Sequence, residues 1–326
     1  MNEEKQKTIN IVNELINDLY LDLRRKVNYW SEITNQTPQA RMGYIGQHLV
    51  SIVTGFKGGK SGARGYDIIL PNDKYGEIKT CYRVDQLGKC LSCGNVVSSI
   101  ESKCSVCQSE NIKRNDDSKW LLTIKKYEDL EKMIEPEVYY FVLFEFDSKN
   151  INDIDISIWE VNPKNFGFSL CMVDYYFNIR ANSSSKAPFN MWPYQFKYYL
   201  TKPIKIYEST IKEDNTIETH IFMPEERRCD RVKFSSFANA NTITLENLND
   251  VIRKFNIECD NKADKRKMLK SVDEWLLKND DKYENFVDEF AKSVYIPLIK
   301  KYKEEIPDVY FNIINKEELE SVKNFV

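Results

Sequence analysis

The sequence lacks any apolar run of the length that crosses a membrane, and it has no repeated or low-complexity segment. A membrane-spanning helix needs about 20 consecutive apolar residues, so we expect no membrane association. An excess of charge of one sign is also missing, because 47 lysines and arginines stand against 50 acidic residues and the net charge is −3. Any affinity for a polyanion must therefore come from a local basic patch and not from the overall charge.

The N-terminal segment is also without the apolar stretch of a signal peptide, because residues 1–7 are largely charged. We therefore expect a cytoplasmic protein. What the sequence does contain is a globular composition, with 42% hydrophobic, 13% aromatic and 30% charged residues. Its 326 residues allow one large domain, or one core with a smaller appendage.

Four of the eight cysteines form two Cys-x-x-Cys pairs that are separated by ten residues. The pairs are Cys90 with Cys93 and Cys104 with Cys107. Each pair presents two thiolates at one knuckle, and two knuckles close a tetrahedral Zn²⁺ site. Disulfides do not suit a reducing cytoplasm, and a redox motif needs only one pair. The spacing therefore predicts a structural zinc ion in a compact module inserted at about residues 86–115.

A second group of polar residues brackets a predicted β-hairpin. Asp67 precedes the apolar stretch 68–70, and Glu77 and Lys79 flank Ile78 after a gap of nine residues. The Pro-Asn-Asp-Lys segment between them has the composition of a turn. Side chains alternate along a strand, so Glu77 and Lys79 share one face while Ile78 points into the core. Two carboxylates beside an ammonium can hold a divalent cation and activate a water molecule, which is the apparatus for cutting a phosphodiester bond.

The register of this hairpin decides whether one site can form. A four-residue turn with regular pairing puts Asp67 opposite Ile78, which turns it away from Glu77. A one-residue irregularity must therefore shift the pairing so that Asp67 lies opposite Glu77. We expect a bulge or broken pairing between Pro71 and Gly76, because glycine tolerates the backbone angles of a bulge.

A capped helix is predicted just before the hairpin. Thr37 is a suitable N-cap, Pro38 suits the first helical position, and apolar residues at helical spacing continue to about Val53. In this helix Gln47 offers an amide that can hydrogen-bond a metal-bound water. The neighbouring His48, one of only two histidines, could act as a base. A lone histidine on such a helix is more often a core residue, and we favour that interpretation.

The triad resembles the PD-(D/E)xK nuclease superfamily, although Tyr66 stands where the signature has its proline. The resemblance implies Mg²⁺ held by Asp67, Glu77 and the backbone carbonyl of Ile78. It also implies that Lys79 orients or deprotonates the attacking water. In that superfamily the preceding helix often carries a further acidic residue. The matching stretch here offers an amide, and we include it among the catalytic candidates: Gln47.

The resemblance also implies a substrate and partners. Double-stranded DNA is the expected substrate, with contacts from basic residues near the hairpin: Lys57, Lys60, Arg64 and Arg83. A homodimer is expected, because cutting both strands calls for two sites. A cognate DNA methyltransferase is expected in the same system. The zinc insertion and the Ala-Pro-Phe-Asn-x-Trp-Pro-Tyr segment at 187–194 resemble MamI-type restriction enzymes, which implies a type II restriction endonuclease.

The segment 182–195 is polar, then aromatic, and contains two prolines, which is typical of a loop. Such a loop could line a DNA groove, and we expect base or phosphate contacts from four of its residues: Ser185, Lys186, Asn190 and Gln195. The alternative is a structural crossover packed by Phe189 and Trp192. The sequence favours neither.

The predicted fold class is α/β (α+β), with a central mixed sheet flanked by helices as in restriction endonucleases, a zinc-ribbon insertion and a helical C-terminal region. Strands are expected at 119–124, 138–146, 154–161 and 196–200, and helices at 7–30, 127–134, 245–255, 262–278, 283–302 and from 316. We expect a nuclease core over residues 1–240 and a helical region over 241–326.

Two other functions remain compatible with the sequence. One is a structure-specific nuclease for repair or recombination, which would cut branched DNA without sequence preference. The other is a non-catalytic, zinc-containing DNA-binding protein, in which the Asp–Glu–Lys pattern is accidental and the hairpin carries only a surface ion pair. DNA binding without Mg²⁺-dependent cutting would indicate the second.

Overall fold

The computed structural model describes residues 3–38, 43–59, 66–84, 86–98, 101–114, 119–147, 149–184, 189–191, 195–260, 263–311 and 313. Contacts divide the chain into two compact units, and each unit is assembled from segments that are not consecutive in the sequence. The first unit comprises Met1–Trp120, Val138–Glu160 and Lys205–Arg227. The second comprises Leu121–Glu137, Val161–Ile204 and Arg228–Val326.

These units do not correspond to a single cut in the chain. The second unit contains the C-terminal helices but also residues 121–137 and 161–204. A unit that is defined by its internal contacts need not fold on its own. The division into residues 1–240 and 241–326 therefore stays a prediction about separable domains.

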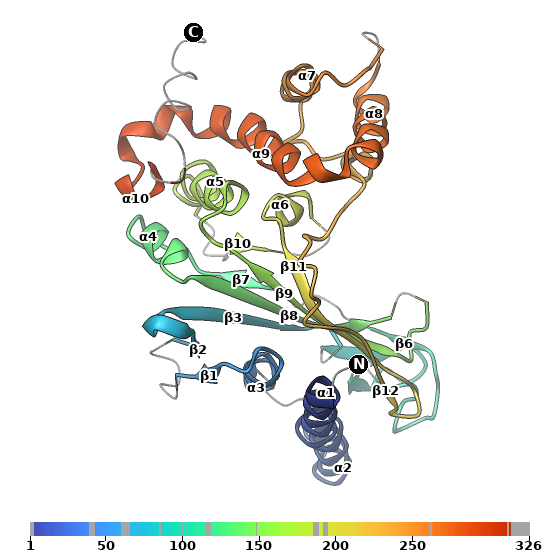
Figure 1. Ribbon diagram of the computed structural model, residues 1–326. Coiled ribbons are helices and arrows are strands. Elements are labelled where there is room, and N and C mark those ends of the chain that lie inside the picture. Colours follow the sequence, from blue (N-terminus) through green and yellow to red (C-terminus); the bar gives the residue numbers. More distant parts are fainter. Residues whose placement is uncertain are drawn as a thin grey trace. The chain divides into compact units, whose positions relative to one another are not determined.

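A seven-stranded mixed sheet forms the centre of the first unit (Figure 1), in the order β1-β2-β3-β8-β9-β11-β12. Strand β3 (Tyr75–Tyr82) runs parallel to β8 (Val138–Phe146), whereas its other neighbour, β2, is antiparallel to it. The remaining strands are β1 (Lys57–Gly58), β2 (Ile68–Ile69), β9 (Ile154–Val161), β11 (Ile204–Ile211) and β12 (Ile217–Phe222). The predicted central mixed sheet is confirmed.

Two of the predicted strands have the observed bounds, 138–146 and 154–161. Strand β8 is apolar along almost its whole length, and Phe141, Val142, Leu143 and Phe144 are each fully buried. A continuous apolar run suits a strand that is covered on both faces. Strand β8 also lies inside the sheet, between β3 and β9.

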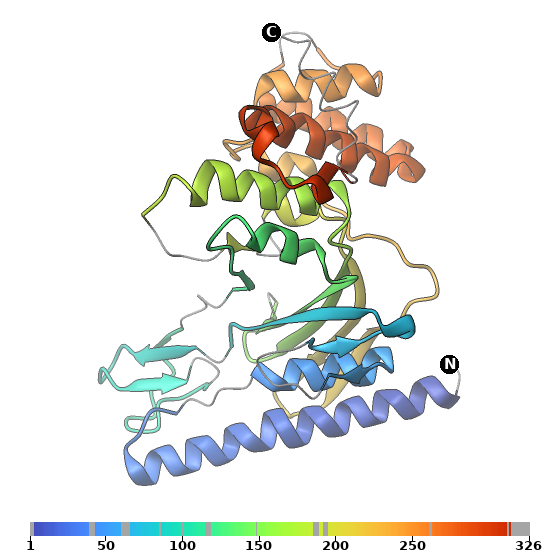
Figure 2. The ribbon, with the colours of Figure 1, turned by 90° about the vertical axis from the view of Figure 1, so that its left-hand side faces the viewer.

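Helices α1 (Glu3–Leu15) and α2 (Leu23–Thr34) are joined by the π-helical segment Ile16–Asp22 into one rod, which Figure 2 shows along its whole length. The helix predicted at 7–30 is therefore confirmed. Its expected apolar face is buried only in part, because Val12 and Ile16 are buried whereas Leu19 and Trp30 are exposed. Helix α3 (Gly43–Thr54) packs on α1 and on β3. The predicted start of α3 falls partly outside the described residues.

The four-cysteine insertion is a three-stranded sheet of order β5-β4-β6 within the first unit. Its strands are β4 (Leu87–Cys90), β5 (Val96–Ser98) and β6 (Ile112–Lys113). Among the described residues of the insertion, the buried hydrophobic cluster comprises four: Cys90, Val97, Cys104 and Ile112. The insertion is attached to helix α2, where Arg24 Nη2 donates a hydrogen bond of 3.0 Å to Ser98 Oγ. A core this small cannot hold a fold without further support.

The second unit is mainly helical. Its helices are α4 (Asp129–Ile134), α5 (Phe166–Asp174), α6 (Phe196–Tyr199), α7 (Leu245–Lys254), α8 (Lys265–Lys278), α9 (Tyr283–Ile299) and α10 (Asp308–Phe311). A short antiparallel pair, β7 (Leu121–Leu122) with β10 (Phe189–Asn190), completes it. Its core is aromatic: the Phe234 ring lies 5.2 Å from the Phe286 ring and 5.3 Å from the Phe290 ring. The predicted helical C-terminal region is confirmed.

Some predicted elements differ from those observed. The strand expected at 196–200 is wrong, because Phe196–Tyr199 forms one turn of helix and Leu200 N donates to Phe196 O. Burial does alternate along this segment, as in a strand, but Phe196 packs against Phe290 of α9. The strand expected at 119–124 shrinks to Leu121–Leu122. The helix expected from residue 316 lies outside the described residues. No described helix is long and apolar enough to cross a membrane.

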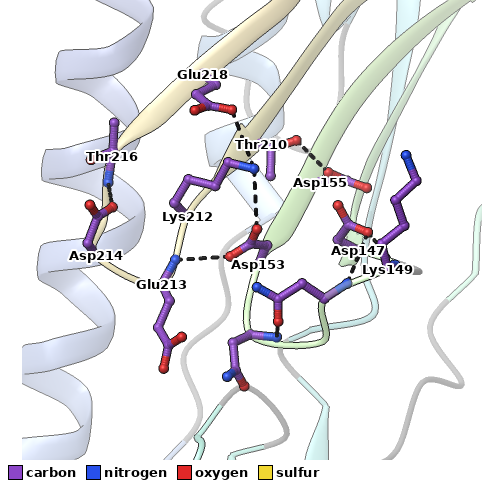
Figure 3. A network of polar contacts seen from close by, with 12 residues as sticks. Asp147, Lys149, Asp153, Asp155, Thr210, Lys212, Glu213, Asp214, Thr216 and Glu218 are labelled. Atoms are coloured by element: carbon purple, nitrogen blue, oxygen red, sulfur yellow. Dashed lines mark hydrogen bonds and ion pairs between the residues drawn. The ribbon is translucent and has the colours of Figure 1, made fainter.

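A polar network ties two turns of the large sheet together (Figure 3). Asp153, in the turn between β8 and β9, is only 6% exposed. Its Oδ1 accepts from the backbone N–H of Glu213, at 3.1 Å, and its Oδ2 contacts Lys212 Nζ at 3.3 Å. Glu213 and Lys212 belong to the turn between β11 and β12. The buried carboxylate therefore holds the ends of two hairpins in register, because both of its oxygens are satisfied.

In the same network, Asp155 Oδ1 accepts from Thr210 Oγ1 at 2.7 Å, and Thr210 Oγ1 contacts His220 Nε2 at 2.8 Å. Burial raises the pKa of the Asp155 carboxyl, and the hydrogen bond from Thr210 opposes this rise. The negative charges of Asp147 and Glu208 raise the pKa further, while the charge of His220 lowers it. Asp155 is therefore harder to ionise in the folded protein than in the unfolded chain.

We predict that Asp155→Asn gains stability relative to the wild type as pH rises. The unfolded carboxyl titrates at about pH 3.9, and the folded one titrates higher, so the unfolded chain releases its proton first. The Asp155 contribution to the free energy of unfolding then falls from about pH 3.9 up to the folded pKa. Urea unfolding at a series of pH values measures this.

Asp214→Asn is the matched control, because a hydrogen bond from the Thr216 backbone lowers the pKa of Asp214. Its contribution is present above the unfolded pKa and is lost as pH falls through the folded pKa. The Asp214 variant should therefore lose stability relative to the wild type as pH rises. The same pH slope for both variants would contradict the assignment.

Candidate active site and four-cysteine centre

The β2–β3 hairpin brings Asp67 opposite Glu77. Ile68 pairs with Gly76 and Ile69 pairs with Tyr75, so the next position in the same register aligns Asp67 with Glu77. The predicted shift of pairing is confirmed.

Its predicted cause, a bulge at Gly76 after a four-residue turn, is wrong. Leu70 N donates to Lys74 O at 2.8 Å, so the turn contains only three residues, Pro71–Asp73. Asn72 and Asp73 both adopt the left-handed conformation, at φ 60° and 55°. Asparagine and aspartate tolerate this conformation better than other side chains that carry a Cβ atom. Two such residues in a row make a three-residue turn possible. A turn of three residues, and not four, pairs Ile68 with Gly76 and so aligns Asp67 with Glu77.

Gly76 has a different role from the one predicted. A Cβ atom at this position would lie 2.9 Å from side-chain carbons of both Ile68 and Val138. These residues belong to the two strands that flank β3. Glycine therefore lets the neighbouring side chains close over β3 beside the hairpin.

The Asp67 carboxylate is held at both oxygens. Its Oδ1 accepts from Gln47 Nε2 at 2.7 Å, and its Oδ2 accepts from the backbone N–H of Ile78 at 2.8 Å. Burial raises the pKa of the Asp67 carboxyl, the Ile78 hydrogen bond opposes the rise, and the negative charge of Glu77 adds to it. Each carboxylate oxygen keeps a second acceptor position free of these bonds. The Asp67 carboxylate is thus fixed in place and still able to bind a cation.

Glu77 and Lys79 lie next to it on strand β3. Lys79 Nζ is 2.5 Å from Glu77 Oε1, and the side chains are 29% and 28% exposed, respectively. Ile78 between them is 6% exposed, as the alternation of side chains predicts. The hairpin therefore presents two carboxylates and one ammonium together at a partly shielded position.

Helix α3 approaches β3 closely enough to deliver Gln47, and this depends on Gly46. A Cβ atom at Gly46 would lie 2.0 Å from Thr80 Oγ1. The Gly46 N–H also donates to the Tyr82 hydroxyl at 3.2 Å. Neither Gly46 nor Thr80 is among the residues expected from the sequence, although a glycine on the apolar side of a helix is a signal of close packing.

His48 on the same helix is exposed. The interpretation of His48 as a core residue is therefore wrong, because the turn of helix that buries Leu49 and Val50 directs the preceding side chain to solvent.

The four cysteines of the insertion meet at one point, with all sulfurs within 4.8 Å of one another. Cys90 Sγ is 3.5 Å from Cys107 Sγ, and Cys93 Sγ is 3.6 Å from Cys104 Sγ. A tetrahedral Zn²⁺ with Zn–S bonds of about 2.3 Å requires sulfurs about 3.8 Å apart, whereas a disulfide requires about 2.0 Å. The cluster therefore suits a structural zinc ion. No other group of three or more such ligands occurs in the part of the chain that the structure describes.

The two knuckles have the same backbone shape. Gly94 N donates to Cys90 O at 2.9 Å, and Gln108 N donates to Cys104 O at 2.8 Å. Gly94 and Gln108 are both left-handed, at φ 79° and 58°. The Cys93 backbone N–H lowers the pKa of Cys90 to about 6, although burial opposes this, and the Cys107 backbone N–H lowers the pKa of Cys104. The backbone thus favours the thiolate form at Cys90 and Cys104, whereas the contacts with the other cysteine sulfurs raise the pKa of Cys107. A bound cation would offset this repulsion among the four sulfurs.

The residues expected to contact DNA are distributed over both units. Lys57 is exposed on the short edge strand β1, and Arg83 is partly buried, with Nη1 3.5 Å from Glu145 Oε2. In the second unit, Asn190 is on β10, and Gln195 directly precedes α6. Four further candidates lie outside the described residues: Lys60, Arg64, Ser185 and Lys186. Phe189 is buried against Tyr175, with the rings 4.7 Å apart, and Trp192 lies outside the described residues.

The described structure thus combines a mixed sheet, a hairpin that carries aspartate, glutamate and lysine, and a four-cysteine insertion after the same strand. The chain belongs to the MamI restriction endonuclease family, whose family model matches residues 29–238. This range includes the hairpin, the four cysteines and the segment 182–195. Membership in this family implies type II restriction endonuclease activity on DNA. No curated protein sequence and no solved structure matches the chain.

We predict that Gly46→Ala lowers the free energy of unfolding by about 1–3 kcal/mol, the typical cost of overpacking. The new methyl group meets Thr80, so the double variant with Thr80→Ala should recover part of the loss. Thr80→Ala alone is the control. Chemical unfolding of the four proteins measures the coupling, and equal stability of Gly46→Ala and the wild type would contradict the close approach.

We predict one tightly bound zinc ion per chain. Elemental analysis of freshly purified protein tests this, and a Cys104→Ser variant should lose the metal, whereas Cys259→Ser, outside the cluster, should retain it. Chelation should disorder residues near 86–115 before it unfolds the large sheet, as amide hydrogen exchange can measure. Freshly purified protein without zinc would overturn the assignment.

Proposed function

We propose that this protein is a Mg²⁺-dependent type II restriction endonuclease that hydrolyses phosphodiester bonds at a specific sequence in double-stranded DNA. The observation that carries the proposal is the register of the β2–β3 hairpin, which aligns Asp67 with Glu77 beside Lys79. The family match favours a restriction enzyme over the repair nuclease and over the non-catalytic DNA-binding protein.

The donor set near the hairpin fits a hard divalent cation. Asp67 and Glu77 supply carboxylate oxygens, and the Ile78 carbonyl supplies a neutral oxygen, which are the ligand types that Mg²⁺ prefers. Burial and mutual repulsion make the Asp67 carboxylate costly to ionise, and a cation would remove that cost. When bound, the metal ion supplies Lewis acidity to the scissile phosphate and lowers the pKa of a bound water.

We propose that the Lys79 ammonium orients the attacking water, or that Lys79 deprotonates this water after it has lost its own proton. Its ammonium is paired with Glu77, at 2.5 Å, so it is already held at the acidic centre. Its positive charge also offsets the negative charge that develops on the phosphate. Gln47 acts through Asp67, because its amide fixes the orientation of that carboxylate.

DNA contacts are proposed at two places. Near the hairpin, the proposed phosphate contacts are Lys57, Lys60, Arg64 and Arg83. In the segment 182–195, the proposed base or phosphate contacts are Ser185, Lys186, Asn190 and Gln195. The overall charge of −3 makes such local contacts necessary.

We also propose a homodimer, because two equivalent centres can cut both strands of a symmetric site. A cognate DNA methyltransferase would protect the same sequence in the host. A reducing cytoplasm is the proposed location, since four cysteines must remain thiolates to hold zinc.

The decisive experiment incubates purified protein with mixed plasmid DNA and Mg²⁺. Discrete fragments are expected, and their ends define the recognition sequence. Random degradation would indicate a non-specific nuclease. Binding without cleavage would indicate the non-catalytic alternative.

We predict that Asp67→Ala, Glu77→Ala and Lys79→Ala each abolish cleavage while DNA binding is largely retained. Removal of either carboxylate should tighten binding slightly, because it reduces repulsion of the phosphates. Glu14→Ala, an exposed acidic position on α1, is the matched control and should cut normally. Cleavage assays measure the loss of activity, and gel-shift assays measure DNA binding. Cutting by Glu77→Ala at a near-wild-type rate would contradict the catalytic role of the hairpin.

A further inference from the structure

The second unit contains a cavity of about 410 Å³, within the roughly 300–1,000 Å³ range of small-molecule sites. Aromatic side chains form much of its wall: Tyr175, Phe189, Phe196 and Phe237. Polar groups also line it: Cys171, Asp174, Gln195, Lys197, Thr242 and Tyr295. Among these is Gln195, a residue of the segment expected to contact DNA. The catalytic hairpin contributes nothing to this cavity.

The cavity carries an ammonium and a carboxylate that do not neutralise each other directly. Lys197 Nζ lies 4.2 Å from the centre of the Phe189 ring, and Asp174 acts on it through its charge without a hydrogen bond between the two. Asp174 is 8% exposed, and its Oδ1 accepts from Asn178 Nδ2 at 2.9 Å. Asp174 Oδ2 has no such bond among the described residues. One cation and one anion thus face a space that is large enough for a ligand.

Burial makes both groups costly to charge. It lowers the pKa of Lys197, although the negative charges that Cys171 and Asp174 can carry oppose this. Burial also raises the pKa of Asp174, against the hydrogen bond from Asn178. Such groups gain most from a ligand that donates to the carboxylate and accepts from the ammonium at the same time.

We propose that this cavity binds a single nucleobase, with Asp174 accepting from the base and Lys197 donating to it. Each base carries a hydrogen-bond donor beside an acceptor on its pairing edge. Its flat ring suits aromatic walls, on which bases stack with little sequence preference. An aliphatic ligand could use the charged groups and pack on these walls, but it could not stack on the rings. The Gln195 amide, which has no hydrogen bond to a described residue, supplies a further contact at the rim.

The source of the base rests on the proposed function. A restriction enzyme meets bases in duplex DNA, and a base reaches such a cavity only by rotating out of the stack. A free nucleoside offers the same chemistry without this step. The two sources therefore need separate experiments.

Three substitutions test the cavity: Lys197→Met, Asp174→Asn and Gln195→Ala. The first two keep the side-chain volume and remove the charge. Gln195→Ala alters the rim, so it remains informative if either buried substitution lowers the melting temperature. Lys270→Met, at an exposed position on α8, is the matched control for loss of one positive charge.

The first experiment measures binding of the four deoxynucleosides to the whole protein by saturation-transfer NMR. Signals from at least one nucleoside are expected with the wild type and with Lys270→Met. They should weaken roughly tenfold in the variants of Lys197 and Asp174, the size of effect expected for a lost hydrogen bond to a base edge. This experiment does not depend on DNA cleavage.

The second experiment uses duplexes with the mapped cleavage site and one mismatch at each position in turn, in Ca²⁺ to prevent cutting. A mismatched base leaves the stack at lower cost, so a mismatch at the extruded position should tighten binding roughly tenfold in the wild type. The gain should disappear in the Lys197 and Asp174 variants and persist in Lys270→Met. Gel-shift titration measures it.

The outcomes separate this inference from the proposed function. A protein that cuts DNA at a defined site, but shows neither nucleoside binding nor a mismatch effect, overturns the base pocket and leaves the restriction activity. Nucleoside binding by a protein that does not cut DNA supports the pocket with a free ligand and overturns the proposed function. Nucleoside or mismatch effects that are unchanged in all three cavity variants overturn the pocket.

Discussion

The hydrogen bond from the Ile78 backbone to the Asp67 carboxylate is the contact on which the candidate active site depends. The backbone pairing of β2 with β3 ends at this point. The Ile78 N–H therefore donates to Asp67 Oδ2 and not to a backbone carbonyl of the neighbouring strand. Asp67 is thereby fixed next to the end of strand β2, where it is partly buried. Three features support this position of Asp67. The three-residue turn sets the register of the hairpin. Gly46 and Gly76 leave room for Thr80 and for the neighbouring strands, respectively.

The sequence was sufficient to predict an element or a site where a single local pattern determined it. A continuous apolar run identified β8, and two Cys-x-x-Cys pairs identified the four-cysteine centre, because nothing distant competes with either pattern. The hairpin register could also be inferred, since Asp67 and Glu77 can share a site only in one alignment. Its cause could not, because the length of the turn depended on two consecutive left-handed residues, Asn72 and Asp73.

Prediction failed where packing between distant segments decided the outcome. Residues 196–200 have the alternation of a strand, but the aromatic cluster with Phe290 holds them as a helical turn. The closeness of α3 to β3 follows from Thr80 facing Gly46 across 34 residues of sequence, which no local pattern reveals. The catalytic roles of the hairpin residues and the DNA contacts remain predictions, since they depend on a bound metal ion and a bound duplex.

The interleaving of the two units has a consequence for synthesis of the protein. The chain passes from one unit to the other after residues 120, 137, 160, 204 and 227, so the last strand of the large sheet, β12, emerges late. A ribosome that has made the hairpin and the cysteine insertion has not yet made β11 and β12. The large sheet is therefore completed only after two thirds of the chain, and a prematurely terminated fragment carries Asp67, Glu77 and Lys79 without the sheet that supports them. For a protein of a DNA-cutting family, this order of synthesis means that the candidate site is supported by its complete sheet only once about two thirds of the chain has been made.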